Sequence, residues 1–316
     1  MYQLKLKENR SEVIPYPSPC MHIRGYRGRL YEYPDRQVAA HWHSELEFLL
    51  VEAGNAVYRV NGTDYPMAAG DGLFINSNRL HSGASMNGGD FIYAVLQVPP
   101  AFFSENPYIA TQYLNPLICT ESLDSLLLRQ GEPWQAAMLE RIDQLIRVNL
   151  ERPEFYELET MRDMYAVLED LYRHAVPRQI LRSTQSAGVA ALMQMLAYIQ
   201  AHFDQRLQLK DIAGAGAMCQ SKCCALFKKF LRQSPFTYLQ NFRIQKSFLL
   251  LSNSQMSVTD VACACGFSGA SYFIEVFRRS TGLTPGEFRR RLPDGTFTQE
   301  AMNCAILPSP PAAPQA

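Results

Sequence analysis

The stretch from Ser257 to Arg290, SVTDVACACGFSGASYFIEVFRRSTGLTPGEFRR, determines the fold of the C-terminal third of this chain. Ser257 is followed three residues later by Asp260, a capping-box pattern that marks the start of a helix. Gly266 stands where a tight turn is expected. Apolar residues then recur at helical spacing and predict the buried face of a second helix: Phe273, Val276 and Phe277. Two helices joined by a tight turn predict a helix-turn-helix unit.

A second copy of this unit lies earlier in the chain, from Leu209 to Tyr238. The copies are offset by 49 residues at their starts and by 50 from Phe273 onward, so the second turn holds one extra residue. A repeat at fixed spacing indicates one supersecondary unit used twice. Two such units in tandem can read two stretches of DNA major groove. The repeat therefore predicts a DNA-binding protein.

The charge of the chain is divided unevenly between its two ends. Residues 192–292 hold 13 Lys and Arg against 5 Asp and Glu, whereas residues 1–191 hold 17 against 23. A basic C-terminal module suits a polyanionic partner at that end only. The 316 residues predict about two domains. No apolar run reaches the length of a membrane span, and the N-terminus lacks the apolar core of a signal peptide, so we expect a cytoplasmic protein.

Five of the eight cysteines crowd the basic module, at 219, 223, 224, 263 and 265. In a cytoplasmic protein a disulfide framework is not expected. These residues are predicted to be small buried apolar side chains. A metal or redox sensor built from Cys263, Cys265 and the 219–224 cluster is the alternative.

The predicted architecture is α+β with two domains. Residues 1–175 are expected to form an effector-binding and dimerisation domain, with a β-barrel over about 20–100 and helices over about 107–175. Within it, Asn61-Gly62 supplies the turn of a predicted hairpin, and Pro153 separates two amphipathic helices. A linker is expected at 176–188, the DNA-binding domain at 189–292 and a disordered tail at 293–316.

Polar residues alternate along the segment His41-Trp42-His43-Ser44-Glu45-Leu46-Glu47. In a strand, residues two apart share a face, so His41, His43, Glu45 and Glu47 are expected to point the same way. Four polar groups on one barrel wall are costly to bury without partners. His81 follows later in the sequence.

Three interpretations of this constellation stay open. Three histidines and a carboxylate are ligand types for a metal ion. The same groups could hydrogen-bond an organic effector, with Trp42 and Tyr58 among the nearby aromatic residues. The third interpretation is an internal polar network without a ligand.

The two helix-turn-helix copies resemble the AraC/XylS family of transcription regulators over about residues 190–292. The resemblance implies seven helices, of which the third and sixth are recognition helices. It places base-facing candidates at Ser221, Cys224 and Ala225 in the first, and at Ser271, Ile274 and Glu275 in the second. Further DNA contacts are expected from Lys222, Lys228, Lys229, Arg243, Arg278 and Arg279.

Two positions depart from the long polar or basic side chains that the family often carries there. Ala225 cannot hydrogen-bond a base, so the first helix is expected to read DNA weakly or through thymine methyl groups. Glu275 can accept a hydrogen bond from cytosine N4, but it also repels phosphate.

The spacing HxH-x3-E-x6-G from His41 to Gly54, with His81 downstream, resembles the cupin motifs. The resemblance implies a metal site in cupin enzymes and an effector pocket in many AraC-type sugar regulators. His41, His43, Glu47 and His81 are therefore the expected effector-binding residues, with metal binding by the same four as the alternative. No cofactor is expected.

The predicted function is sequence-specific DNA binding by a transcription regulator, not an enzyme, that responds to a small molecule, with a carbohydrate as the leading class. The alternatives are a metal-dependent cupin enzyme carrying a DNA-binding tail and a metal or thiol sensor. The expected partners are double-stranded DNA, the effector, a second copy of the chain as a homodimer, and RNA polymerase; no membrane partner is expected.

Overall fold

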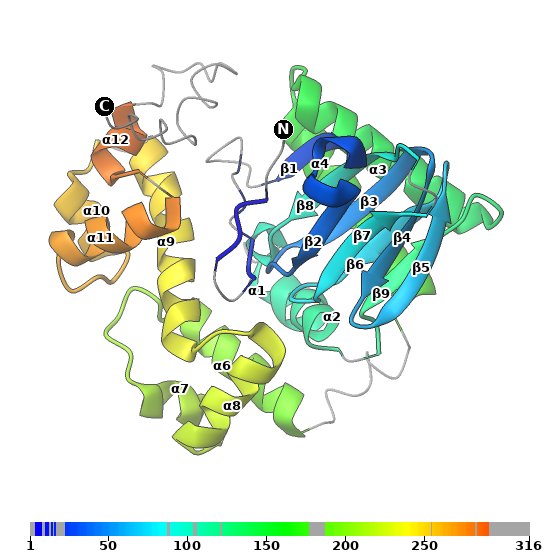
Figure 1. Ribbon diagram of the computed structural model, residues 1–316. Helices are drawn as coiled ribbons and strands as arrows, with labels where there is room; N and C mark the ends of the chain where they lie inside the picture. Colours follow the sequence, from blue (N-terminus) through cyan, green and yellow to red (C-terminus); the bar gives the residue numbers. More distant parts are fainter. Residues whose placement is uncertain are drawn as a thin grey trace, which may run out of the picture.

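A computed structural model describes residues 23–290 apart from 87–88, 104–105, 121, 177–186, 254 and 282, together with residues 4–7, 10–12, 14 and 16. Figure 1 shows a sheet-rich N-terminal domain beside a helical C-terminal domain. The predicted two-domain α+β fold is confirmed. Most of the predicted linker and the whole predicted tail lie outside the described residues.

The described part of the N-terminal domain is built on two antiparallel sheets. One has the strand order β1-β8-β3-β6-β9 and the other the order β2-β7-β4-β5. The strands are β1 Arg24–Arg29, β2 Gln37–His41, β3 Leu46–Ala53, β4 Asn55–Val60, β5 Thr63–Ala68, β6 Gly72–Ile75, β7 His81–Ser85, β8 Ile92–Val98 and β9 Ser125–Leu128. The expected hairpin joins β4 to β5, with Asn61 at φ 47° and Gly62 at φ 91°.

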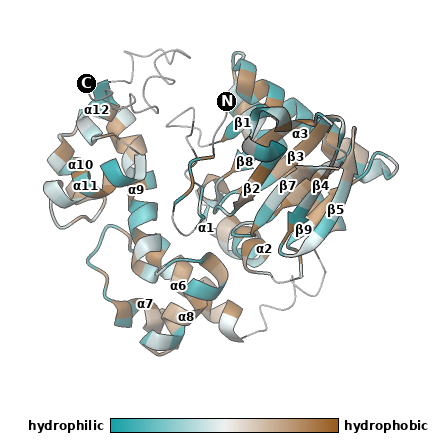
Figure 2. Ribbon diagram, viewed as in Figure 1, coloured by the Kyte–Doolittle hydropathy of each residue, from teal (hydrophilic) through white to brown (hydrophobic). Residues whose placement is uncertain are grey.

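The barrel interior is filled by aromatic side chains from both sheets. Tyr58, Phe91 and Tyr93 are almost fully buried, and the Phe91 and Tyr93 rings stack at 5.5 Å. The central strand β3 is hydrophobic along much of its length (Figure 2). One strand lies beyond the predicted barrel range, because β9 returns to pair with β6 after a helical excursion.

Helices cover one sheet and connect the two domains. The short helices of this domain are 3-10 turns at Leu30–Glu32, Pro34–Arg36 and Pro100–Phe103, α1 Pro107–Ile109, a π-helical turn at Ala110–Leu114, and α2 Asn115–Cys119. The expected helical hairpin is formed by α3 Pro133–Glu151 and α4 Tyr156–His174. Helix α3 packs on β1, β3 and β8.

The described residues of the C-terminal domain form the seven helices implied by the family resemblance. They are α6 Ala187–Ala201, α7 Leu209–Ala215, α8 Gln220–Leu231, α9 Pro235–Asn253, α10 Val258–Ala264, α11 Ala270–Thr281 and α12 Pro285–Arg290. Helix α9 joins the two helix-turn-helix units (Figure 1). None of the helices in the described part of the chain has the length and apolar character needed to cross a membrane.

The helix caps follow the sequence signals. The hydroxyl of Ser257 accepts the backbone N–H of Asp260, and the Asp260 carboxylate accepts the backbone N–H of Ser257 in return. Thr284 and Glu287 form the same reciprocal pair before α12. Each cap satisfies backbone N–H groups that the first helical turn leaves unpaired.

The two helix-turn-helix turns differ in how they reverse direction. Gly266 takes the left-handed conformation in the second unit, at φ 75°. The matching residue in the first unit is Ala217, at φ 50°, and Gly216 stands just before it in the same turn. Gly216 is needed for close packing, because a Cβ there would lie 2.6 Å from the Met195 side chain and 2.7 Å from the Ala191 carbonyl oxygen.

The two domains meet at α2, which contacts α6 and α8. Leu117, Ile118 and Cys119 of α2 are buried in one continuous apolar cluster with residues of α6 and α8 such as Leu192 and Leu231. A short helix of the N-terminal domain therefore rests directly on the first helix-turn-helix unit.

Candidate functional site

Helix α8, the predicted first recognition helix, has one buried and one exposed face. Cys223 and Phe227 are fully buried. The predicted DNA-facing residues lie on the other side: Ser221, Lys222, Ala225, Lys228 and Lys229 are exposed and Cys224 is half-buried. Two lysines thus stand at the C-terminal end of an exposed helix face.

Helix α11, the predicted second recognition helix, repeats this arrangement. Phe273, Val276 and Phe277 are buried against α9, α10 and α12. The predicted DNA-facing residues Ser271, Glu275, Arg278 and Arg279 are exposed, and Ile274 is half-buried. Glu275 therefore sits beside the buried stripe on the outer face of the helix.

Arg243 is placed differently from the other predicted DNA contacts. Its guanidinium is largely buried and donates to the backbone carbonyl oxygens of Phe203 and Gln205, both at 2.7 Å. It also lies 5.7 Å from the centre of the Phe267 ring. These contacts tie α9 to the segment after α6 and to the second unit, so Arg243 lies apart from the exposed faces of α8 and α11, and its contact with DNA stays a prediction.

The polar constellation of the N-terminal domain is brought together in the barrel, but not on one strand. Strand β2 ends at His41, β3 begins at Leu46, and His43 and Glu45 lie in the segment between them. The prediction that these four side chains share one face of a single strand is therefore wrong, because the chain leaves one sheet after β2 and enters the other at β3. All four side chains are nonetheless buried, and His81 joins them from the start of β7.

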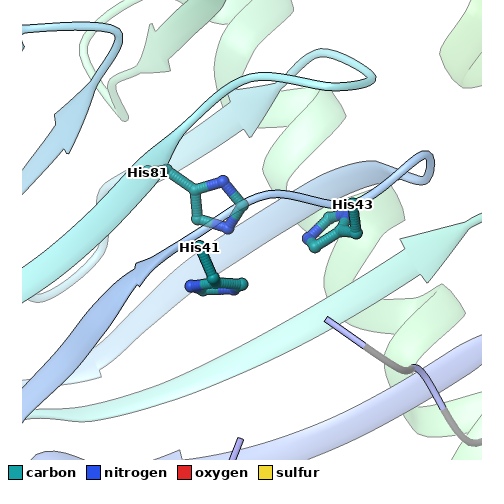
Figure 3. Close-up of side chains that lie close together, drawn as sticks. All are labelled: His41, His43 and His81. Carbon is teal, nitrogen blue, oxygen red and sulfur yellow. The ribbon is translucent and has the colours of Figure 1, made fainter. Parts of the chain in front are cut away.

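The three imidazole rings lie against one another (Figure 3). Ring centres are 4.2 Å apart for His41 and His81, 5.0 Å for His43 and His81, and 5.8 Å for His41 and His43. Glu47 lies beside two of them: one carboxylate oxygen is 3.0 Å from His43 Nε2 and the other is 3.7 Å from His81 Nε2. We call His41, His43, Glu47 and His81 the histidine cluster.

A second layer of polar side chains surrounds the histidine cluster, and the sequence analysis missed it. Gln97 on β8 donates to Glu47 at 3.0 Å and to Glu12 at 3.4 Å, and it accepts from Arg24 at 3.2 Å. Glu12 lies 3.6 Å from His41 Nε2. Only three-dimensional pairing reveals these residues, because they come from opposite ends of the domain with no shared spacing.

Burial and mutual contact set the charge states of the histidine cluster. Burial lowers the pKa of His81 and, together with the neighbouring rings, that of His41. Burial also opposes charge on His43, but Glu47 outweighs it and raises that pKa to about 9. Burial alone would raise the pKa of Glu47, but His81 and His43 hold it well below its usual range. Glu47 and His43 therefore stabilise each other's charged forms, whereas burial disfavours charge on His41 and His81.

The donor set fits a metal ion in residue type and arrangement. His41, His43 and His81 each offer a ring nitrogen, and these three atoms lie within 4.8 Å of one another. Neutral imidazole and ionised carboxylate are the forms that bind divalent cations, so His43 would have to release its proton to a bound ion. The same nitrogens and oxygens could equally hydrogen-bond the hydroxyl groups of an organic ligand.

Comparison with known families matches both domains. A helix-turn-helix domain model matches residues 212–291, and an AraC-like ligand binding domain model matches residues 25–161. The exposed recognition helices and the polar barrel each lie within the matching region. This chain belongs to the AraC family of transcription regulators, with a ligand-binding barrel before its double helix-turn-helix.

Two known regulators align with this chain over most of their length. The "Uncharacterized HTH-type transcriptional regulator YdeC" of Bacillus subtilis (strain 168) is 29% identical over 293 residues, which cover 92% of this chain and 99% of the relative. The "HTH-type transcriptional activator RhaR" of Escherichia coli O139:H28 is 26% identical over 265 residues, covering 81% and 89%. The crystal structure of ToxT from Vibrio cholerae with a bound unsaturated fatty acid is 13% identical, with a TM-score of 0.44, covering 87% and 96%.

Proposed function

We propose that this regulator changes its DNA binding when a ligand occupies the histidine cluster. The observation that carries the proposal is the cluster itself: three imidazoles and a carboxylate, all buried, inside a domain of the ligand-binding type. Buried polar groups normally have hydrogen-bond partners. Among the described residues, His43 Nδ1 and His81 Nε2 have none. A ligand would supply the missing partners.

The DNA-binding half of the proposal uses the two exposed helix faces. Helix α9 has 19 residues and so spans about 28 Å at about 1.5 Å per residue. That length approaches one turn of DNA, about 34 Å. We propose that α8 and α11 enter successive major-groove segments, with Lys228, Lys229, Arg278 and Arg279 contacting phosphates.

We propose that the barrel serves regulation and not turnover, because its relatives are regulators over most of their length. The chain would then act in the cytoplasm, where the DNA is. The homodimer and the contact with RNA polymerase stay predictions. A sugar effector also stays a prediction, supported by the buried polar groups of the histidine cluster and by the buried aromatic residues Tyr58 and Tyr93 of the same barrel.

A reporter experiment tests the role of the histidine cluster. The full-length protein would control a promoter carrying a DNA site selected by the same protein from random duplexes, in cultures given a panel of monosaccharides and of divalent metal salts. We expect one compound to change the output of wild type and of the control His202→Ala, but not of His43→Ala or Glu47→Gln. A His43→Ala protein that follows wild type throughout, or a wild type indifferent to the whole panel, would overturn the proposal.

A further inference from the structure

We propose that Gln240, Arg243 and Tyr272 hold the two helix-turn-helix units at a fixed angle, and that this angle sets the spacing between the two DNA segments that the protein accepts. The inference rests on the proposed entry of α8 and α11 into successive major-groove segments, and it concerns contacts outside their exposed faces. We call these three side chains, with the backbone of residues 203–205, the inter-unit clamp.

The two helix-turn-helix units have separate apolar cores. Among the described residues, the buried side chains of α6, α7 and α8 join the large cluster that extends into the N-terminal domain. Those of α10, α11 and the second half of α9 form a cluster of their own. Apolar packing therefore fixes the helices within each unit, whereas the orientation between the units depends on α9 and on the contacts beside it (Figure 1).

Helix α9 contains a feature that favours bending. The hydroxyl of Ser247 donates to the carbonyl oxygen of Ile244, three residues earlier, at 2.7 Å. A serine that bonds back to its own helix often bends that helix, and long helices are rarely straight. A fixed distance between α8 and α11 therefore requires contacts outside α9.

Arg243 makes the first of these contacts. Its guanidinium donates to the carbonyl oxygens of Phe203 and Gln205, both at 2.7 Å. These acceptors lie between α6 and α7, in the first unit. The guanidinium carbon also lies 5.7 Å from the ring centre of Phe267, in the turn of the second unit. One largely buried cation on α9 thus contacts both units.

The turn of the second unit rests directly on the same backbone. A Cβ at Gly266 would lie 2.6 Å from the carbonyl oxygens of both Phe203 and Asp204. Only glycine allows this approach, and it also tolerates the φ of 75°. The backbones of the two units therefore touch at the segment that Arg243 holds.

The third contact acts on α11 itself. Gln240 on α9 donates through Nε2 to the phenolic oxygen of Tyr272, in the first turn of α11. The rings of Tyr272 and Phe267 meet edge to face, with centres 6.1 Å apart. Tyr272 directly follows Ser271, a predicted base-facing residue. Because the N-terminal part of a recognition helix contacts base edges, this hydrogen bond positions the end of α11 that would read the second segment.

The clamp has a direct consequence for the DNA site. One base pair advances about 3.4 Å along the duplex. A change in the angle between α9 and α11 that moves the start of α11 by this distance changes the accepted spacing by one base pair. The intact clamp therefore selects one spacing, and a weakened clamp accepts neighbouring spacings as well. The position in α8 that corresponds to Tyr272 is Lys222, so the clamp acts on the second unit.

Binding to duplexes of altered spacing tests the inference. They would carry the selected site with one base pair inserted or deleted between its two preferred segments, and fluorescence anisotropy of the full-length protein would give each affinity. We expect wild type to bind them at least about 10-fold more weakly, a loss like that from one mismatched base pair. Tyr272→Phe and Gln240→Ala should each reduce this penalty by about 2- to 10-fold, the range for one hydrogen bond. The control Tyr108→Phe, at an exposed tyrosine of the N-terminal domain, should keep the wild-type penalty.

Arg243→Lys keeps the positive charge but loses the rigid fork of donors, so it should also reduce the penalty. Tyr272→Phe removes a single oxygen atom and so guards against loss of fold, which circular dichroism and thermal melting would check in every variant. A wild type without a spacing penalty, an unchanged penalty in all three variants, or a loss of affinity that is equal at every spacing would each overturn the clamp. Equal binding of selected and shuffled duplexes by wild type would overturn the proposed DNA reading as well, so the two failures are distinguishable.

Discussion

Neighbouring side chains on α11 have opposite environments, because a helix turns about 100° at each residue. Val276 and Phe277 are buried, whereas Glu275 is exposed. An acidic side chain on a face that meets phosphates repels them unless it finds a base to bond. Substitutions of Glu275 can therefore distinguish recognition of a base from general electrostatic attraction to DNA.

Replacing Glu275 tests whether it reads a base. If its carboxylate accepts from cytosine N4, Glu275→Ala should relax preference at one base pair of the site by about 1–3 kcal/mol. Glu275→Gln should shift that preference towards adenine, which pairs with Gln in the major groove. Selection of random duplexes by each full-length variant measures this. Uniformly tighter binding by both variants, with every base preference unchanged, would exclude base reading.

Substitution of Phe277 tests whether its ring belongs to the core of the second helix-turn-helix unit. Its ring is fully buried and lies 5.4 Å from Phe248, 5.6 Å from Phe273 and 5.5 Å from Phe288. Phe277→Ala should lower the free energy of unfolding by about 3–5 kcal/mol. The matched control is Phe236→Ala, because Phe236 is 41% exposed. Equal melting curves for the two variants would show that Phe277 is not in the core.

At the scale of elements, residues 76–81 connect the histidine cluster to the domain interface. Asn76 donates to the carbonyl oxygens of Leu117 and Leu123, both at 2.8 Å. The backbone N–H of Asn78 donates to the carbonyl of His43 at 2.8 Å, and His81 ends the segment. The segment thus contains His81, contacts His43 and also contacts α2 through Leu117. Helix α2 in turn rests on α6 and α8.

The rate at which the Cys119 thiol is alkylated reports on how tightly α2 is packed at this interface. Burial raises the pKa of its thiol to about 12, so little reactive thiolate is present at pH 8. Alkylation followed by peptide mass spectrometry should label the exposed Cys219 and Cys263 much faster than Cys119. Asn76→Ala leaves two buried carbonyls without that donor, so it should speed labelling of Cys119 and leave Cys219 unchanged. Equal rates for Cys119 and Cys219 in wild type would contradict the packed interface.

The elements also show what sequence can and cannot predict. Helices α8 and α11 follow from local apolar periodicity and α10 and α12 from their caps, and both signals depend on residues a few positions apart. The histidine cluster was found by residue type, but its geometry depends on a bend between β2 and β3 and on pairing with β7. Glu12 and Gln97 escaped notice because they lie 85 residues apart in the chain and meet only in the folded barrel.

At the scale of the whole molecule, opposite charges are segregated by domain. The basic excess of residues 192–292 lies in the helix-turn-helix domain, and the acidic excess lies in residues 1–191. The continuous apolar cluster around α2 packs the barrel domain against the DNA-binding domain. The molecule therefore joins an acidic ligand-binding domain to a basic DNA-binding domain through a buried contact.

The salt dependence of DNA binding follows from this charge distribution. Each phosphate neutralised should contribute about −0.9 to the slope of log affinity against log salt concentration. Lys228→Ala and Arg278→Ala in the full-length protein should each make that slope shallower by about one contact, without changing the preferred sequence. Fluorescence anisotropy at several salt concentrations measures the slopes. Slopes equal to wild type in both variants would exclude these phosphate contacts.

The most direct test of the account is the affinity of the full-length protein for its selected duplex, compared with a shuffled duplex of the same composition at physiological salt. Sequence-specific regulators bind their sites about 10³–10⁷ times more tightly than other DNA. We predict a ratio of at least about 10³, with the selected site holding two preferred segments about one helical turn apart. Equal affinity for the two duplexes would contradict the assignment of α8 and α11 as recognition helices.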